Sequence, residues 1–120
     1  MYFSSIGALF LLLGVGAGAF GAHGLRDHLA PDMLAVFETG ARYQLIHGLG
    51  LILVGSRKDG ASPAHAWGGW LLVAGTVIFS GSLYALALSG VRLWGAVTPI
   101  GGVCFLAGWG TLARAWWPSR

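Results

Sequence analysis

Charged residues and cysteines are scarce in this chain. Only 9% of its 120 residues are charged, whereas 56% are hydrophobic. Soluble domains carry about 25% charged residues, so this composition excludes an ordinary soluble protein. The single cysteine, Cys104, excludes an internal disulfide and a cluster of thiolate metal ligands. We therefore expect the protein to lie in a membrane.

Several sequence patterns of binding and catalysis are also missing. The net charge is +3, but the seven basic residues are scattered singly apart from Arg57-Lys58, which excludes the basic stripe of a nucleic-acid-binding protein. There is no nucleophile-base-acid set, no phosphate-binding loop and no haem-attachment motif. We expect neither enzymatic activity nor a cofactor.

Long apolar runs dominate the chain instead. A membrane-spanning helix needs about 20 mostly apolar residues, and four segments qualify: about 2–22, 35–55, 66–89 and 93–117. The second has polar first turns, which indicates that it begins in the interface or faces the protein interior. Tryptophans at the ends of the later segments are typical of interfacial belts, with Trp109 deeper. The sequence predicts one all-α domain over residues 1–120, an integral membrane four-helix bundle.

Glycine is abundant, with 21 residues that fall mostly inside the predicted spans. Small residues let membrane helices approach closely. We expect a monomeric, tightly packed bundle whose spans meet through Gly14, Gly18, Gly101 and Gly108.

Four spans place both termini on one side of the membrane. Basic residues are more frequent in cytoplasmic loops. The side of the termini holds Arg57, Lys58, Arg114 and Arg120, and the other side holds Arg26, Arg42 and Arg92. This bias of four to three favours cytoplasmic termini.

The stretch "GAFGAHGLRDHLAPDMLAVFETGARYQLIHGLG", residues 18–50, holds three of the four histidines, three of the four acidic residues and two arginines. Pro31 and Asp32 predict a helix that starts there and continues into the second span. Glu38 and Arg42, four residues apart with the acid first, favour an ion pair that neutralises itself at the membrane edge. A functional role for the two charges is the alternative.

A second polar stripe on this helix contains Tyr43, Gln44 and His47. A polar group at membrane depth has to be hydrogen-bonded by a neighbour. The candidate partners of His47 are Tyr43, Ser80, Ser82, Tyr84 and Thr98. The stripe and these partners form an outer-side polar cluster, in which His47 either bridges helices or serves as a ligand-binding or proton-handling group.

Two further histidines precede the helix. His23 and His28 lie five residues apart and flank Asp27, and imidazoles with a carboxylate suit a transition metal. A metal site needs three or four ligands. The two histidines are therefore weak candidates, and we expect no metal.

The motifs "GAFGAHGL", "FETGARYQLIHGLGL", "SGSLYAL" and "TPIGGVCFLAGW" occur in this order along the chain. This pattern resembles the family of small membrane proteins known as domain of unknown function 423, which includes eukaryotic transmembrane protein 256. The resemblance implies a four-span protein of the inner (cytoplasmic) membrane. It also implies recurring polar positions at His23, Glu38, Arg42, Tyr43, Gln44, His47, Ser80, Ser82, Tyr84, Thr98 and Pro99.

Three functions follow from these patterns. The first is a non-enzymatic membrane protein whose polar cluster binds a lipidic or small amphipathic ligand, or docks a partner subunit. The second is a small oligomeric transporter or channel, although the first and third spans lack polar residues in their inner halves. The third is a metal or haem site built from His23, His28 and His47.

Overall fold

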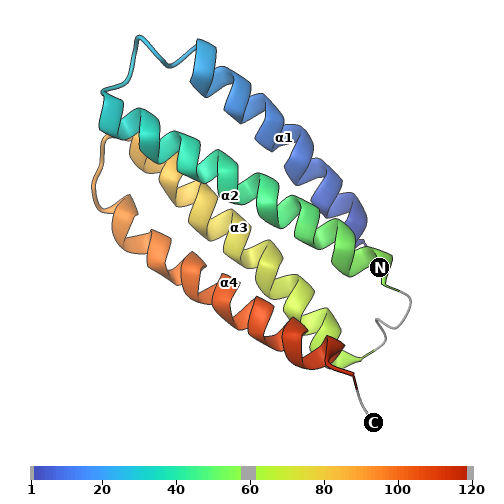
Figure 1. Cartoon of the computed structure of the whole chain (residues 1–120). Coiled ribbons are helices and arrows are strands. Elements are labelled where there is room, and N and C mark those ends of the chain that lie inside the picture. Colours follow the sequence, from blue (N-terminus) through green and yellow to red (C-terminus); the bar gives the residue numbers. More distant parts are fainter. Residues whose placement is uncertain (1, 58–61, 119–120) are drawn as a thin grey trace.

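The chain folds into four α-helices in a computed structural model that describes residues 2–57 and 62–118. The helices are α1 (Phe3–His23), α2 (Pro31–Ser56), α3 (Pro63–Ser89) and α4 (Trp94–Trp116) (Figure 1). No strand occurs in the described ranges. The predicted all-α four-helix architecture is confirmed. Lys58 and Arg120, which contributed to the charge count, lie outside the described residues.

Local sequence signals set the helix boundaries. Pro31 and Pro63 occupy the first turns of α2 and α3, where a missing backbone N–H costs nothing. The Ser62 hydroxyl accepts a hydrogen bond from the backbone N–H of His65 and caps α3. Gly90 ends α3 with φ of 70°, a left-handed conformation that favours glycine. The predicted start of a helix near Pro31 is confirmed.

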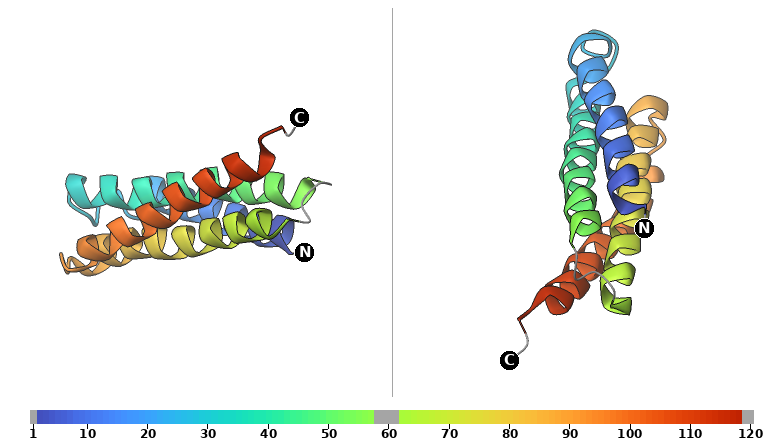
Figure 2. Two further views of the ribbon diagram at one scale, coloured as in Figure 1. Left: turned by 90° about the horizontal axis from the view of Figure 1, so that it is seen from below. Right: turned by 90° about the vertical axis from the view of Figure 1, so that its right-hand side faces the viewer.

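Each helix packs mainly on its neighbours in the sequence. α1 contacts α2, α2 contacts α3, and α3 contacts α4, so that α1 and α4 lie at opposite sides of the row (Figures 1 and 2). The molecule measures 55 × 26 × 19 Å, with its long dimension along the helices. The start of α1 and the end of α4 lie at the same end of the bundle (Figure 1). α2 lies between α1 and α3 and also touches α4, because a Cβ at Gly50 would lie 2.9 Å from the Trp109 ring, while one face of α2 stays open.

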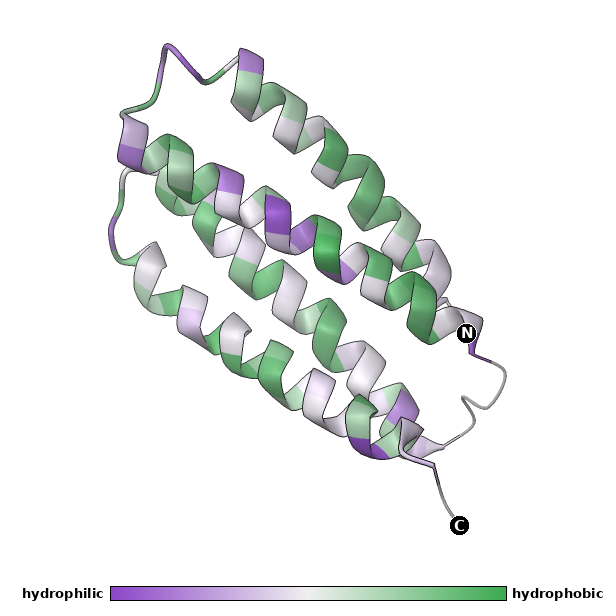
Figure 3. Cartoon of the chain, in the orientation of Figure 1, coloured by the Kyte–Doolittle hydropathy of each residue, from purple (hydrophilic) through white to green (hydrophobic). Residues whose placement is uncertain are grey.

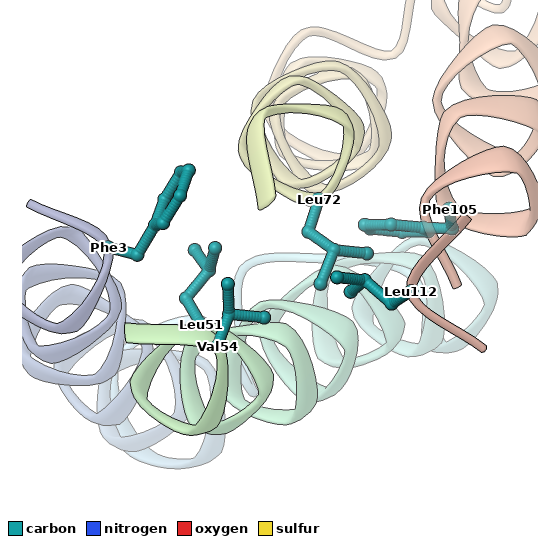
Figure 4. Close-up of a cluster of buried hydrophobic side chains, with 6 residues drawn as sticks. All are labelled: Phe3, Leu51, Val54, Leu72, Phe105 and Leu112. Atoms are coloured by element: carbon teal, nitrogen blue, oxygen red, sulfur yellow. The ribbon is translucent and has the colours of Figure 1, made fainter. Parts of the chain in front are cut away.

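Two hydrophobic clusters hold the helices together. The larger one draws on all four helices and contains Phe3, Leu51, Val54, Leu72, Phe105 and Leu112 (Figure 4). The smaller one, near the loop that joins α1 to α2, contains Leu25, Phe37 and Ala87. Along both α2 and α3, buried polar residues lie between the two clusters.

Glycines mark the closest approaches between helices. A Cβ added at Gly7 would lie 2.5 Å from the carbonyl oxygen of Gly48, and one at Gly101 would meet the backbone of Phe79. Such contacts leave no room for any larger side chain. α1 therefore packs on α2, and α3 on α4, at distances that only glycine allows.

The predicted glycine contacts are confirmed at three of the four positions. A Cβ at Gly14 would lie 2.9 Å from the Leu45 side chain, and one at Gly108 would lie 2.9 Å from Leu72. A Cβ at Gly101 would meet the backbone of Phe79, but nothing lies within 4 Å of a Cβ at Gly18. The prediction for Gly18 is wrong because its Cβ position points into open space rather than at α2.

Three helices, α1, α3 and α4, are long and apolar enough to cross a membrane. α2 is as long as they are but too polar to meet the same criterion among the described residues. Hydrophilic patches colour the middle of α2, whereas the visible faces of the other helices are mostly hydrophobic (Figure 3). Polarity therefore concentrates on α2.

Candidate functional site

Gln44 joins three helices by hydrogen bonds. Its amide Nε2 donates to the carbonyl oxygen of Phe10 in α1 at 2.9 Å. Its Oε1 accepts from the hydroxyl of Tyr84 in α3 at 2.6 Å. Gln44 is only 6% exposed, so these two bonds satisfy a buried amide. Gln44 and Tyr84 were both predicted members of the polar cluster, and the structure brings them together.

Serine and threonine hydroxyls join the helices nearer the loop that connects α3 to α4. Ser80 donates to the carbonyl oxygen of Gly40 at 2.7 Å and so ties α3 to α2. The hydroxyls of Ser82 and Thr98 lie 2.6 Å apart and tie α3 to α4. Ser82 also donates to the carbonyl oxygen of Phe79 at 2.9 Å. The Thr98 hydroxyl also lies 3.4 Å from the carbonyl oxygen of Trp94, so either hydroxyl can be the donor in the bond between Ser82 and Thr98.

His47 is held on both ring nitrogens. Its Nδ1 lies 2.8 Å from the carbonyl oxygen of Tyr43, and its Nε2 accepts from the indole N–H of Trp109 at 3.0 Å. A carbonyl oxygen only accepts, so the ring carries its proton on Nδ1. The ring stacks on Phe105, with centroids 3.6 Å apart. His47 therefore bridges α2 and α4.

The expected partners of His47 are mostly wrong. Its partners are the Tyr43 backbone and Trp109, whereas the hydroxyls of Ser80, Ser82, Tyr84 and Thr98 bond elsewhere. α4 runs antiparallel to α3 and packs against α2 at Gly50, where a Cβ would lie 2.9 Å from the Trp109 ring. This packing brings an indole to the imidazole before any hydroxyl reaches it.

Tyr43 does not point into the polar cluster as expected. Its side chain is 36% exposed, and its ring packs on Phe79 with centroids 4.7 Å apart. The ring also faces Phe105 at 6.3 Å. Tyr43 therefore contributes an aromatic contact to α3 and α4, and its backbone carbonyl contributes the hydrogen bond to His47.

The charged candidates lie outside the cluster. Glu38 and Arg42 are both exposed, and the part of the chain that the structure describes contains no ion pair between them. The expected pair is absent because both side chains extend from the open face of α2, where no neighbouring helix orders them. They are separate from the buried polar groups.

The two histidines near the first loop, His23 and His28, are exposed as well. His23 is the last residue of α1, and His28 lies in the loop that follows. Among the described residues, no group of three or more histidines, cysteines or carboxylates is close enough to hold a metal ion. His23 is thus not brought to the other predicted site residues.

A second histidine bridge escaped the sequence analysis. His65 is 4% exposed, and its Nε2 donates to the carbonyl oxygen of Val54 at 3.0 Å. Its Nδ1 accepts from the indole N–H of Trp116 at 3.0 Å. The Arg57 guanidinium covers the Trp116 ring at 4.6 Å. Trp109 and Trp116 are seven residues apart and so share a face of α4, a signal that could have revealed the bridge.

The buried polar side chains find hydrogen-bond partners within the chain. Over residues 2–57 and 62–118, every buried side-chain nitrogen and oxygen has a hydrogen-bond partner. Gln44 and His47 lie near the middle of α2, Ser82 and Thr98 lie toward one end, and His65 toward the other. With His65 included, the buried polar side chains therefore extend along most of the length of the bundle.

Two apolar hollows lie on the surface at helix ends. One, of about 330 Å³, is lined by Pro63, Ala66, Trp67 and Trp70. The other, of about 220 Å³, is lined by Val91, Leu93, Trp94 and Val97. None of the predicted site residues lines either hollow.

Comparisons with known proteins agree with the resemblance in the sequence. The family described as "Protein of unknown function (DUF423)" matches residues 17–102. A UPF0382 membrane protein of Staphylococcus haemolyticus is 51% identical over 107 residues, which cover 89% of this chain and 88% of the relative. The UPF0382 membrane protein YwdK of Bacillus subtilis is 45% identical over 109 residues, which cover 89% of each chain. No solved structure matches. The all-helical, glycine-packed chain described here belongs to the DUF423 family of membrane proteins.

Proposed function

We propose that this chain crosses the membrane four times and, without catalysing a reaction, docks another membrane protein against the open face of α2. The topology supports the fourth crossing. α1 and α3 run in the same direction, and α2 connects the end of one to the start of the other (Figure 1). If α1 and α3 both cross the bilayer, α2 has to return the chain across it.

The exposed charges of α2 carry the docking proposal. Arg42 lies five residues from His47, which stacks on Phe105, the central residue of α4. At 1.5 Å per residue, Arg42 lies about 7.5 Å along the helix axis from the level of Phe105. The hydrocarbon core extends about 15 Å on each side of the bilayer midplane, so with Phe105 at the midplane Arg42 lies inside the core. Arginine at the centre of a spanning helix costs about 2.5–3.5 kcal/mol. A protein that covers this face and supplies a counter-charge removes that cost.

The interior of the bundle supports the other functions less well. A ligand or transported solute needs polar groups that are free to bind it, but the buried groups of the described residues already bond one another. Both nitrogens of His47 are engaged, so a metal or haem iron there has to displace Trp109 or the Tyr43 carbonyl. The buried polar groups therefore act as connections between helices.

A lipidic ligand is the second candidate. The hollow of about 330 Å³ beside Trp67 and Trp70 is apolar and opens at the start of α3, where tryptophans mark the membrane interface. An acyl chain fits the chemistry of this hollow. The site is separate from the α2 face, so the two candidates can be tested independently.

Photo-crosslinking in intact membranes tests the docking proposal. A diazirine side chain is placed at Ile46 or Leu49 on the open face of α2, and at Leu12 on α1 or Leu106 on α4 as controls, all of which are exposed. We expect protein adducts from the two α2 positions and lipid adducts from the controls. The proposal fails if the α2 positions give only lipid adducts, or if all four positions capture protein equally.

A further inference from the structure

We propose that the protein docked on α2 is a second copy of this chain, related to the first by a two-fold axis along the membrane normal. This inference rests on the proposed docking function and names its partner. The two α2 helices form the seam of the dimer, and each copy supplies the counter-charge for the other. The proposal departs from the monomer expected from the sequence.

The open face of α2 has the spacing of a helix-pairing seam. Its surface residues recur at alternating intervals of four and three: Ala35, Thr39, Arg42, Ile46, Leu49 and Leu53. All of them are exposed except Thr39, which is half-buried. This heptad spacing keeps one stripe facing a partner in a left-handed helix pair. The small residues Ala35 and Thr39 allow the two backbones to approach near the start of the helix.

The charges on this face complement themselves. Two copies inserted in the same orientation are related by an axis normal to the membrane, so equal residues lie at equal depth. Glu38 and Arg42 differ by four residues, or about 6 Å in depth, which two long side chains can bridge. Glu38 of each copy therefore reaches Arg42 of the other, and the interface gains two ion pairs.

Within one copy, the side chains of Glu38 and Arg42 are available for pairing with a second copy. Neither Glu38 nor Arg42 makes a hydrogen bond or ion pair with the other residues that the structure describes. Arg42 lies within the heptad stripe, and Glu38 flanks it one turn earlier. A face with one acid and one base favours a partner that carries the same arrangement over a partner of one charge sign.

A charge-exchange experiment separates pairing between copies from pairing within one copy. Glu38→Arg gives a face with two arginines, and Arg42→Glu gives a face with two glutamates. Each variant should associate at least tenfold more weakly with itself than the wild type does, because like charges meet in the seam. A mixture of the two variants should recover association, because opposite charges then meet between copies.

The measurement is fluorescence energy transfer between labelled chains in phosphatidylcholine vesicles, with helix content from circular dichroism as the folding check. Arg26→Glu, in the exposed loop after α1, is the matched charge control and should leave association unchanged. A wild-type chain that shows no self-association, or a mixture no better than the single variants, overturns the dimer.

A second measurement does not depend on the charge variants. Equal residues face each other across a two-fold seam, so Ile46→Cys in a Cys104→Ala background should form a disulfide between copies, and Leu12→Cys should not. If Ile46→Cys stays monomeric while the α2 photo-crosslinker captures a different protein, the dimer falls and the docking function stands. If the crosslinker captures no protein, the docking function falls too.

Discussion

Trp109 of α4 donates its indole N–H to Nε2 of His47 in α2 at 3.0 Å. Two turns later, Trp116 makes the same bond to Nδ1 of His65 in α3 at 3.0 Å. Each imidazole then donates to a carbonyl oxygen of α2, at Tyr43 or Val54. α4 is thus fastened to α2 at two levels by the same indole–imidazole–carbonyl arrangement. In a membrane, where water cannot replace a lost partner, such bonds fix helix positions.

Replacing Trp109 with phenylalanine should destabilise the bundle. The variant keeps an aromatic ring but leaves Nε2 of His47 without its donor, and an unsatisfied buried acceptor costs about 1–3 kcal/mol. We expect the melting temperature in detergent to fall by several degrees. Trp67→Phe is the control, because Trp67 is 67% exposed and should change little. Equal melting temperatures for Trp109→Phe and the wild type would contradict the bridge.

Substitutions of His47 should distinguish a bridging role from a ligand-binding or proton-handling one. Glutamine can donate to the Tyr43 carbonyl and accept from Trp109, so His47→Gln should keep the fold and the docking. His47→Leu should lower the melting temperature because it leaves both partners unmet. A His47→Gln variant that folds normally but no longer gives the α2 crosslink would assign His47 a role beyond bridging.

Adjacent glycines of α4 should differ sharply in their tolerance of alanine. A Cβ at Gly101 meets the backbone of Phe79, which cannot move aside cheaply, whereas nothing lies within 4 Å of one at Gly102. Gly101→Ala should lower the melting temperature by several degrees, and Gly102→Ala should preserve or raise it, because alanine favours helices. Similar behaviour of the two variants would disprove the close contact between α3 and α4.

The orientation rests on the charge bias and is directly measurable. Cysteines are placed at Asp32, at the start of α2, and at Ser62, directly before α3, which lie at opposite ends of the bundle. Intact cells are then treated with a membrane-impermeant thiol reagent. If the termini are cytoplasmic, Asp32→Cys should label and Ser62→Cys should label only after lysis. The reverse pattern would place the termini outside.

The helices themselves could be predicted from composition and local signals. Runs of about 20 apolar residues locate α1, α3 and α4, and Pro31 locates the start of α2. That Gln44 belongs to a hydrogen-bonded cluster with residues of α3 was also predictable, since a polar residue at membrane depth needs a neighbour. These features are predictable because they are set within a single helix or involve polar groups with few possible partners.

Contacts set by the relative rotation and offset of helices could not be predicted. Gly14 and Gly18 lie four residues apart on α1, but only Gly14 meets α2; Gly21, seven residues after Gly14, meets Phe37 of α2, so the contact follows the seven-residue spacing. Trp109 became the partner of His47 through the way α4 packs on α2. Glu38 and Arg42 have ion-pair spacing, but no neighbouring helix orders their side chains on the open face of α2.

Nitrogen-15 solid-state NMR of the protein in lipid bilayers tests the central claim most directly, namely that buried polar side chains connect the helices. Histidine and tryptophan are labelled, and the His47→Gln variant assigns the His47 signals. We predict a His47 ring with its proton on Nδ1 and a through-space correlation between its Nε2 and the indole N–H of Trp109. A proton on Nε2, or no correlation with Trp109, would contradict the account.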